Sequence, residues 1–206
     1  MASSTSNGQS WDDRYAEEGF AFGDQPNDFL VESAATFGTG TSLVVGDGDG
    51  RNGVWLAQQG HHVTSIDLSP IGVAKAKKLA EQRGTTLDAR VGDLETFDMG
   101  DAKWESIVSI FCHVPSTLRH IVHANVKRAL KPGGVFVLEA YTKANIGRGV
   151  GGPQNDDLTV EIAELEADFA GWDLITHRAV ERNIVEGKYH NGLSSTVQFL
   201  ARKPRS

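Results

Sequence analysis

The sequence has little cysteine, little basic charge and no long apolar runs. Its 206 residues contain one cysteine, Cys112, which excludes an intramolecular disulfide and a cysteine-rich metal site. No apolar run approaches the roughly 18 residues that a membrane-spanning helix requires. Lysine and arginine number 20 against 27 aspartates and glutamates, a net charge of −7. This acidic balance disfavours a nucleic-acid partner, because binding the phosphate backbone requires clustered basic side chains.

The first ten residues are polar and differ in composition from the rest of the chain. Residues 1–10 have neither the basic stretch nor the apolar core of a secretory signal, and we expect a disordered tail there and a cytoplasmic protein. Residues 11–206 predict a single domain, because a chain of 206 residues fits one core of ordinary size. Within it, the aromatic-rich residues 11–40 predict a cap or lid segment.

Apolar runs and helical patterns alternate along the chain. Strands are predicted at residues 42–45, 62–67, 87–93, 104–112 and 135–141. Because helical patterns separate most of these runs, we expect a mostly parallel, doubly wound α/β sheet between two helical layers. Two further strands, around 173–184 and 195–201, have no helix between them and predict an antiparallel hairpin at one edge.

The glycine-rich stretch LVVGDGDGRNGVWLA, residues 43–57, is the most informative motif. Gly46, Gly48 and Gly50 lie between a buried strand and a helix start, where glycine allows positive φ and close approach of a ligand. The helix N-terminus then offers unpaired N–H groups to an anion. This loop predicts a nucleotide or nucleoside site.

Two carboxylates accompany the glycines. Asp67 ends the second strand 21 residues after Gly46, a spacing that suits hydrogen bonds to ribose hydroxyls, and Asp93 ends the third. A second pattern that starts at Gly48 also matches the G-x-G-x-x-G of dinucleotide enzymes. The pattern starting at Gly46 is favoured, since that glycine directly follows the strand and 206 residues leave little room for a dehydrogenase's substrate domain.

These motifs together resemble the Rossmann-like S-adenosylmethionine-dependent methyltransferases, and among them a bacterial subgroup related to tellurite-resistance methyltransferases. The resemblance runs from about Trp11 to Pro204 and rests on WDDRY…FGDQPNDFL, VVGDGDGRN, VTSIDLS, GDLETFD, IVSIFCHVP and LKPGGVFVLEAY. It implies a seven-stranded sheet in the order 3-2-1-4-5-7-6 with strand 7 antiparallel. It also implies S-adenosyl-L-methionine as the cofactor and S-adenosyl-L-homocysteine as the product.

The resemblance also implies a set of cofactor-binding residues. In it the glycines pass under the methionine part, Asp67 holds the ribose and Asp93 receives the adenine amino group. The full set is Gly46, Asp47, Gly48, Gly50, Asn52, Asp67, Leu68, Asp93, Leu94 and Cys112. The family commonly has an acidic residue where this chain has Val44, so we expect Asp47 or a water network to contact the methionine ammonium group.

The sequence predicts candidate catalytic residues rather than a fixed catalytic motif. Methyl transfer from a sulfonium expels a neutral thioether, so the enzyme mainly aligns the nucleophile and excludes water. His113, after the fourth strand, and Tyr141, at the end of the fifth, are the candidates, although both residue types also occur there as packing side chains. Cys112 is predicted to be a small apolar filler rather than a nucleophile.

Two segments are candidates for covering the site. Tyr15 and Phe22 predict a lid that excludes water, or alternatively a cover for the sheet edge. The glycine-rich loop 142–157 predicts a substrate cover, in which Arg148 would suit a carboxylate or phosphate. His120 and His123 have a spacing that can hold a metal, but no third ligand is evident, so no metal site is predicted.

The sequence therefore predicts a methyltransferase that uses S-adenosyl-L-methionine and acts on a small molecule, without nucleic acid or membrane. The alternatives are a non-catalytic S-adenosylmethionine-binding sensor or scaffold, and an NAD-dependent oxidoreductase. The methyl acceptor stays open between a thiol, an oxyanion, a halide, a hydroxyl and an amine.

Overall fold

The computed structural model describes residues 10–205, so the predicted tail lies outside the described residues except for Ser10. The α-helices are α1 (Trp11–Ala16), α2 (Asp28–Ala34), α3 (Arg51–Gln58), α4 (Pro70–Gln82), α5 (Ser116–Ala129) and α6 (Ile162–Asp168). The strands are β1 (Thr41–Val45), β2 (His62–Asp67), β3 (Asp88–Val91), β4 (Trp104–Ile110), β5 (Leu130–Tyr141), β6 (Asp173–Glu186) and β7 (His190–Arg202). No helix within the described range is long and apolar enough to cross a membrane.

One seven-stranded sheet forms the middle layer, in the order β3-β2-β1-β4-β5-β7-β6. Strands β1 to β5 run parallel, and β7 runs antiparallel to both β5 and β6. The predicted strand order and the antiparallel seventh strand are confirmed. Because β1, β2, β3 and β4 are parallel and adjacent, the loops after their carboxyl ends meet at one edge of the sheet.

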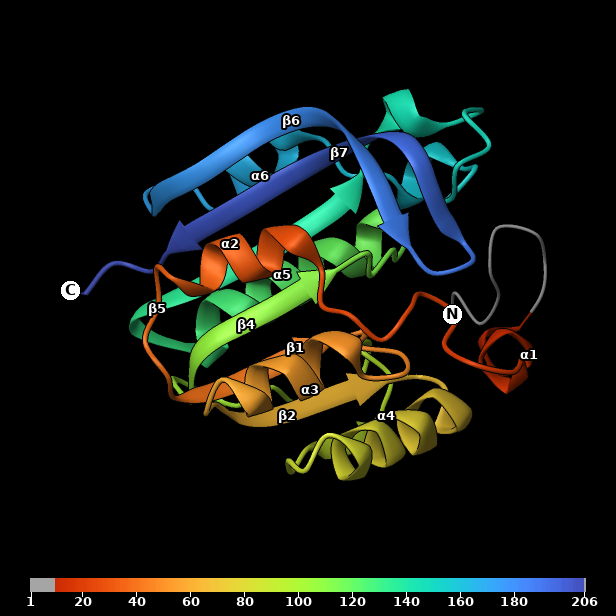
Figure 1. Cartoon of the computed structure of the whole chain (residues 1–206). Helices are drawn as coiled ribbons and strands as arrows, with labels where there is room; N and C mark the ends of the chain where they lie inside the picture. The colour runs from red at the N-terminus through yellow and green to blue at the C-terminus, as the bar shows by residue number, and fades with distance from the viewer. Residues whose placement is uncertain (1–9, 206) are drawn as a thin grey trace.

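The central strand separates two hydrophobic cores. Leu43 and Val45 of β1 pack in the core that α5 and α6 cover, whereas Val44 packs in the core that α2 and α3 cover. This alternation follows from the two-residue period of a strand. Figure 1 shows the resulting three layers, with the sheet between the two groups of helices. The predicted doubly wound α/β fold is confirmed.

Local signals in the sequence determine the helix after β2. Ser69 caps α4 by accepting a hydrogen bond from Gly72 N at 3.0 Å, and Pro70 occupies the first turn. Gly84 adopts a φ of 65° just after the helix ends, a conformation that favours glycine. These residues account for the start and the end of α4.

The terminal hairpin is longer than predicted. Strand β7 begins at His190 rather than 195, and only residues 187–189 connect it to β6. Gly192, predicted to belong to the turn, instead pairs with Ile184 inside the ladder. The hairpin consequently extends to the segment after α1, where Lys188 N donates to Ala21 O at 3.1 Å (Figure 1).

A buried network of charged side chains lies behind the sheet edge where the site forms. Glu139 of β5 is fully buried and accepts hydrogen bonds from Arg182 Nε and Nη2, both at 2.8 Å. Glu186 of β6 accepts from Arg51 Nη2 at 2.6 Å, and Asn27 Nδ2 donates to Glu139 at 2.6 Å and to Glu186 at 2.9 Å. A buried charge is tolerated only when it is paired and hydrogen-bonded, and this network meets that condition.

Arg182→Ala should destabilise the protein by about 3–5 kcal/mol, because it leaves Glu139 buried without its cation. The matched control is Arg90→Ala, which removes an exposed ion pair with Asp88 on β3 and should cost less than about 1 kcal/mol. Urea denaturation measures both free energies of unfolding. Equal, small effects of the two substitutions would contradict the role assigned to the network.

Candidate functional site

A cavity of about 530 Å³ opens at the edge where the parallel strands end. The residues after β1, β2, β3 and β4 form its floor. Helix α1 with Phe22, the loop 149–153 and the hairpin turn with residues 188–191 cover it. The predicted crevice therefore exists, and its cover comes from three segments that are distant in sequence.

Most of the predicted site residues line this cavity. The lining includes Tyr15, Phe22, Gly46, Asp47, Asn52, Asp67, Leu68, Asp93, Leu94, Cys112 and His113. Four predicted residues, Gly48, Gly50, Tyr141 and Arg148, are not among the lining residues.

Neighbouring atoms leave no room for a side chain at three glycines of the loop. A Cβ at Gly46 would lie 2.5 Å from Cys112 Sγ, and one at Gly48 would lie 2.2 Å from Tyr15 Oη. Gly50 has a φ of 90°, and a Cβ there would collide with helix α4. Gly46 therefore allows close approach at the cavity floor, whereas Gly50 serves the packing of α4.

Asp67 holds the glycine loop in place. Its Oδ2 accepts a hydrogen bond from Gly48 N at 2.8 Å, and its Oδ1 accepts one from Ser69 N at 2.8 Å. Burial raises the pKa of this carboxyl, and the two backbone N–H groups oppose that effect. Each carboxylate oxygen keeps a second lone pair, so the side chain can still accept hydrogen bonds from hydroxyls in the cavity.

Asp47 presents a buried carboxyl oxygen with no partner. Its Oδ1 accepts from Gly53 N at 3.2 Å, while its Oδ2 makes no hydrogen bond within the described residues. Burial raises the pKa of Asp47 to about 8, an effect that the nearby carboxylates of Asp67 and Asp49 reinforce. An unpaired acceptor of this kind on a cavity wall fits a cationic ligand group.

Aromatic side chains form another part of the cavity wall. Phe22 and Phe111 flank His190, with ring centroids 4.5 and 4.7 Å from it. His113 Nδ1 lies 2.8 Å from Leu158 O, and burial lowers the pKa of this imidazole to about 4. The ring is therefore neutral at pH 7, and the carbonyl fixes its proton on Nδ1.

Cys112 lines the cavity beside Gly46. Burial raises the pKa of its thiol to about 12, so it stays protonated at neutral pH. This state agrees with the prediction of a small apolar filler.

Tyr141 and Arg148, predicted as catalytic and substrate residues, do not line the cavity. Tyr141 is completely buried and stacks behind Phe111 at 4.7 Å, because the end of β5 directs it under the loop that contains Gly152. Arg148 forms an ion pair with Glu181 and donates from Nε to Ala144 O at 2.8 Å, away from the cavity. The loop contributes backbone at 149–153 rather than this side chain.

The contact that closes the cavity has no signal in the sequence. Arg14 of α1 lies over the Tyr189 ring, with its guanidinium carbon 4.0 Å from the centroid. Glu17 bonds both Lys188 and the Tyr189 hydroxyl. A Cβ at Gly187 would lie 2.4 Å from Gly23 N, so the two backbones touch. The aromatic content of residues 11–40 indicates a cover, but no local pattern shows that the hairpin is its partner.

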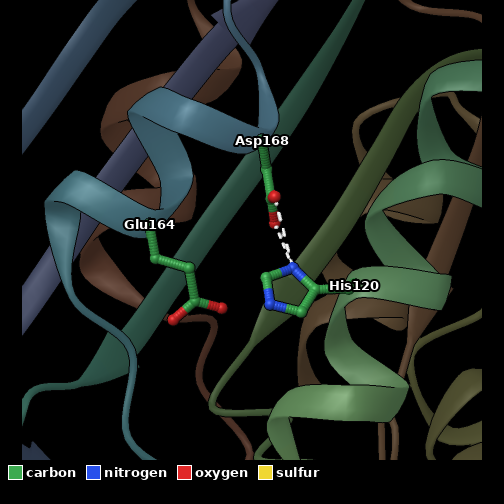
Figure 2. A group of neighbouring side chains, drawn as sticks. All are labelled: His120, Glu164 and Asp168. Atoms are coloured by element: carbon green, nitrogen blue, oxygen red, sulfur yellow. Dashed lines mark hydrogen bonds and ion pairs between the residues drawn. The ribbon is translucent and has the colours of Figure 1, made fainter.

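The two helical histidines belong to a different cluster. Figure 2 shows His120 of α5 beside Glu164 and Asp168 of α6, side chains that could complete a three-ligand group with it. Asp168 accepts from His120 Nδ1 at 3.0 Å and from His123 Nδ1 at 2.6 Å. Arg119 binds both oxygens of Glu164, at 2.5 and 3.0 Å. The carboxylates are thus already engaged, and the cluster joins α5 to α6 away from the cavity.

His113 should make stability depend on pH. Its folded pKa of about 4 lies below the unfolded value of 6.5, so the unfolded chain binds the proton first as pH falls. The contribution of neutral His113 is complete above pH 6.5 and declines toward pH 4, by up to about 3 kcal/mol. Urea denaturation of the wild type and of His113→Gln measures it: the difference between their unfolding free energies should shrink as pH falls. A difference that is constant with pH would contradict a buried neutral imidazole.

Part of the chain is similar to known methyltransferases. Residues 43–134 match the family described as "Methyltransferase domain". A 2-heptyl-1-hydroxyquinolin-4(1H)-one methyltransferase of Mycobacteroides abscessus is 28% identical over 117 residues, which are 55% of this chain and 52% of that protein. A ubiquinone biosynthesis O-methyltransferase of Paramagnetospirillum magneticum is 39% identical over 99 residues, which are 47% of this chain and 39% of that protein. The chain thus spans about half or less of the length of these relatives.

Solved structures show the same fold. TehB from Haemophilus influenzae superimposes with a TM-score of 0.73 at 18% identity, over 95% of this chain and 68% of that one. Identity this low shows the fold alone, so the subgroup related to tellurite resistance stays a prediction. Residues 43–134 are thus similar to a methyltransferase domain, and the chain shares its seven-stranded fold with TehB.

Proposed function

We propose that the protein transfers a methyl group from S-adenosyl-L-methionine to a small molecule. The observation that carries this proposal is the unpartnered Asp47 Oδ2, buried on the wall of a cavity that Asp67 and Asp93 also line. A nucleoside with a cationic amino-acid part requires acceptors of this kind at both of its ends. The single domain proposed for residues 11–206 then contains both the cofactor site and the acceptor site.

The residues present fit the cofactor. Asp47 would bind its ammonium group, Asp67 its ribose hydroxyls, and Asp93 and Leu94 its adenine. The bound cofactor supplies a methyl group on a sulfonium, which a nucleophile takes by in-line displacement. Within the chain, Tyr15 would cover the glycine loop, and Tyr15 and Phe22 together would exclude water from the reacting groups.

Size, enclosure and charge support a small acceptor. The cavity lies beneath α1, the loop 149–153 and the hairpin turn, which leaves little room for a polymer. The two curated relatives are named for a hydroxyquinolone and for ubiquinone biosynthesis, both small molecules. The net charge of −7 supports the proposal that nucleic acid is not a partner, and we propose action in the cytoplasm.

Binding of S-adenosyl-L-homocysteine, which keeps the same ammonium group, should release close to one proton at pH 7. Asp47 has a pKa of about 8 and is protonated before binding, whereas the bound ammonium favours its carboxylate. Isothermal titration calorimetry in buffers of different ionisation enthalpy measures this release. Asp47→Asn should abolish it, and Asp88→Asn, at an exposed aspartate on β3, should preserve it. A wild-type binding enthalpy that does not change with the buffer would contradict the assignment of Asp47.

Calorimetry and product assays together test the activity. We expect S-adenosyl-L-homocysteine to bind, NAD to show no binding heat, and S-adenosyl-L-methionine to be converted when small nucleophiles are supplied. Binding without turnover of any acceptor would favour the sensor, and tight NAD binding without a response to S-adenosyl-L-homocysteine would favour the oxidoreductase.

A further inference from the structure

Buried polar atoms without hydrogen bonds gather beside the aromatic end of the cavity. Among the described residues, His113 Nε2, Tyr141 Oη and His190 Nδ1 are covered and make no hydrogen bond. Ser194 interacts with the Tyr141 hydroxyl and partly opposes the rise of its pKa by burial, and His190 Nδ1 is 3.8 Å from Glu186 Oε2, beyond hydrogen-bond distance. Folded proteins pair the large majority of such atoms, so their concentration in one place calls for a physical reason.

The three side chains form one contact cluster. The Tyr141 ring centroid lies 5.6 Å from that of His113 and 5.3 Å from that of His190. Phe111 contacts both Tyr141 and His190 at 4.7 Å, and it also lines the cavity. The polar atoms therefore belong to the wall that separates the aromatic end from the interior.

A glycine-rich roof keeps the Tyr141 hydroxyl out of the cavity. A Cβ at Gly152 would lie 2.5 Å from the Tyr141 ring, and one at Gly151 would lie 3.3 Å from its hydroxyl. The roof is held by backbone and amide hydrogen bonds, from Asn191 N to Val150 O at 3.1 Å and from Asn145 Nδ2 to Gly151 O at 2.9 Å. Four of the residues 147–153 are glycines without side chains, so lifting this segment breaks mainly these hydrogen bonds and the ion pair between Arg148 and Glu181.

The hydrogen-bonding capacity of the cluster selects a ligand. His113 Nδ1 donates to Leu158 O, so Nε2 carries no proton and can only accept. Burial raises the pKa of Tyr141, whose hydroxyl remains protonated and can donate. A hydroxyl satisfies both groups because it donates and accepts strongly, whereas a thiol does both only weakly and the delocalised lone pair of an aryl amine is a weak acceptor for Tyr141. A thiolate, a halide or a fully ionised oxyanion has no proton for His113. The surrounding rings favour a flat aromatic framework around that hydroxyl.

We propose that His113, Tyr141 and His190 form the recognition site for the hydroxyl of an aromatic methyl acceptor, which reaches them when the roof of residues 147–153 lifts. This inference rests on the proposed methyltransferase function. His113 is then a catalytic residue that contacts the reacting oxygen, and Tyr141 positions that oxygen.

The transfer balances without another reactant. A lone pair of the acceptor oxygen forms the new carbon–oxygen bond while the carbon–sulfur bond breaks, and its electron pair leaves with sulfur as a neutral thioether. The hydroxyl proton passes to His113 Nε2 and then to water. A methylated hydroxyl that still carries its proton is a far stronger acid than imidazolium, so a weakly basic histidine suffices once the new bond has formed.

The acceptor class is tested with three probes that share one ring system: 2-naphthol, 2-naphthalenethiol and 2-naphthylamine. Formation of S-adenosyl-L-homocysteine should be fastest, in kcat/KM, with 2-naphthol. Faster reaction with the thiol or the amine, or cofactor-product binding with no turnover of 2-naphthol, would overturn the hydroxyl assignment and leave the cofactor proposal intact. Absence of S-adenosyl-L-homocysteine binding would overturn both.

Tyr141→Phe tests the positioning residue. It should raise KM for 2-naphthol about tenfold, as the loss of one hydrogen bond predicts, with no change in S-adenosyl-L-homocysteine affinity. Because it removes a buried, unpaired hydroxyl, it should leave the unfolding free energy unchanged or increased. Ser33→Ala is the matched control, since Ser33 Oγ is also buried and unpaired but lies outside the cavity. An unchanged KM in Tyr141→Phe, or an equal rise in Ser33→Ala, would refute the role of Tyr141.

Discussion

The pairing of two buried glutamates with two arginines is the constraint on which the cavity depends. Glu139 and Glu186 would each be costly to bury alone, so Arg182 and Arg51 must stay beside them. These four side chains come from β5, from the start of α3 and from β6. Helix α3, which begins at the cavity floor, and the hairpin of β6 and β7, which covers the cavity, therefore cannot separate without leaving a buried charge unpaired. Burial opposes ionisation of Glu186, yet His190 and Arg51 hold its pKa at about 2.

The cavity has two chemically different ends. Carboxyl groups at Asp47, Asp67 and Asp93 characterise one, and aromatic rings at Phe22 and Phe111 characterise the other. A ligand with a positive amino-acid part and a flat apolar ligand would each bind favourably at only one end. The Cys112 thiol, which also lines the cavity, stays protonated and takes no charge.

The sequence predicts those features that depend on neighbouring residues. The alternation of elements predicts the mostly parallel α/β sheet, and the resemblance to a known family implies its strand order. The glycines and Asp67, at a regular spacing, predict that the loop and this carboxylate meet at one site. The partners of charged side chains could not be predicted in the same way. Arg148 carries a charge suited to a substrate, but its partner, Glu181, lies on a strand far along the chain. For the same reason His120 has carboxylate neighbours on α6 that helical spacing alone does not reveal.

The contact of Gly187 with Gly23 limits how this fold can vary. The two backbones meet there without room for a Cβ atom. No side chain can therefore be added on the side of the turn that faces Gly23. The hairpin turn can gain residues on its outer side, whereas any side chain added on its inner side would push the lid away from the hairpin. We therefore expect substitutions and insertions to be tolerated on the outer side of the turn. A side chain at Gly187, on the inner side, would force the turn away from Gly23 and leave the cavity less closed.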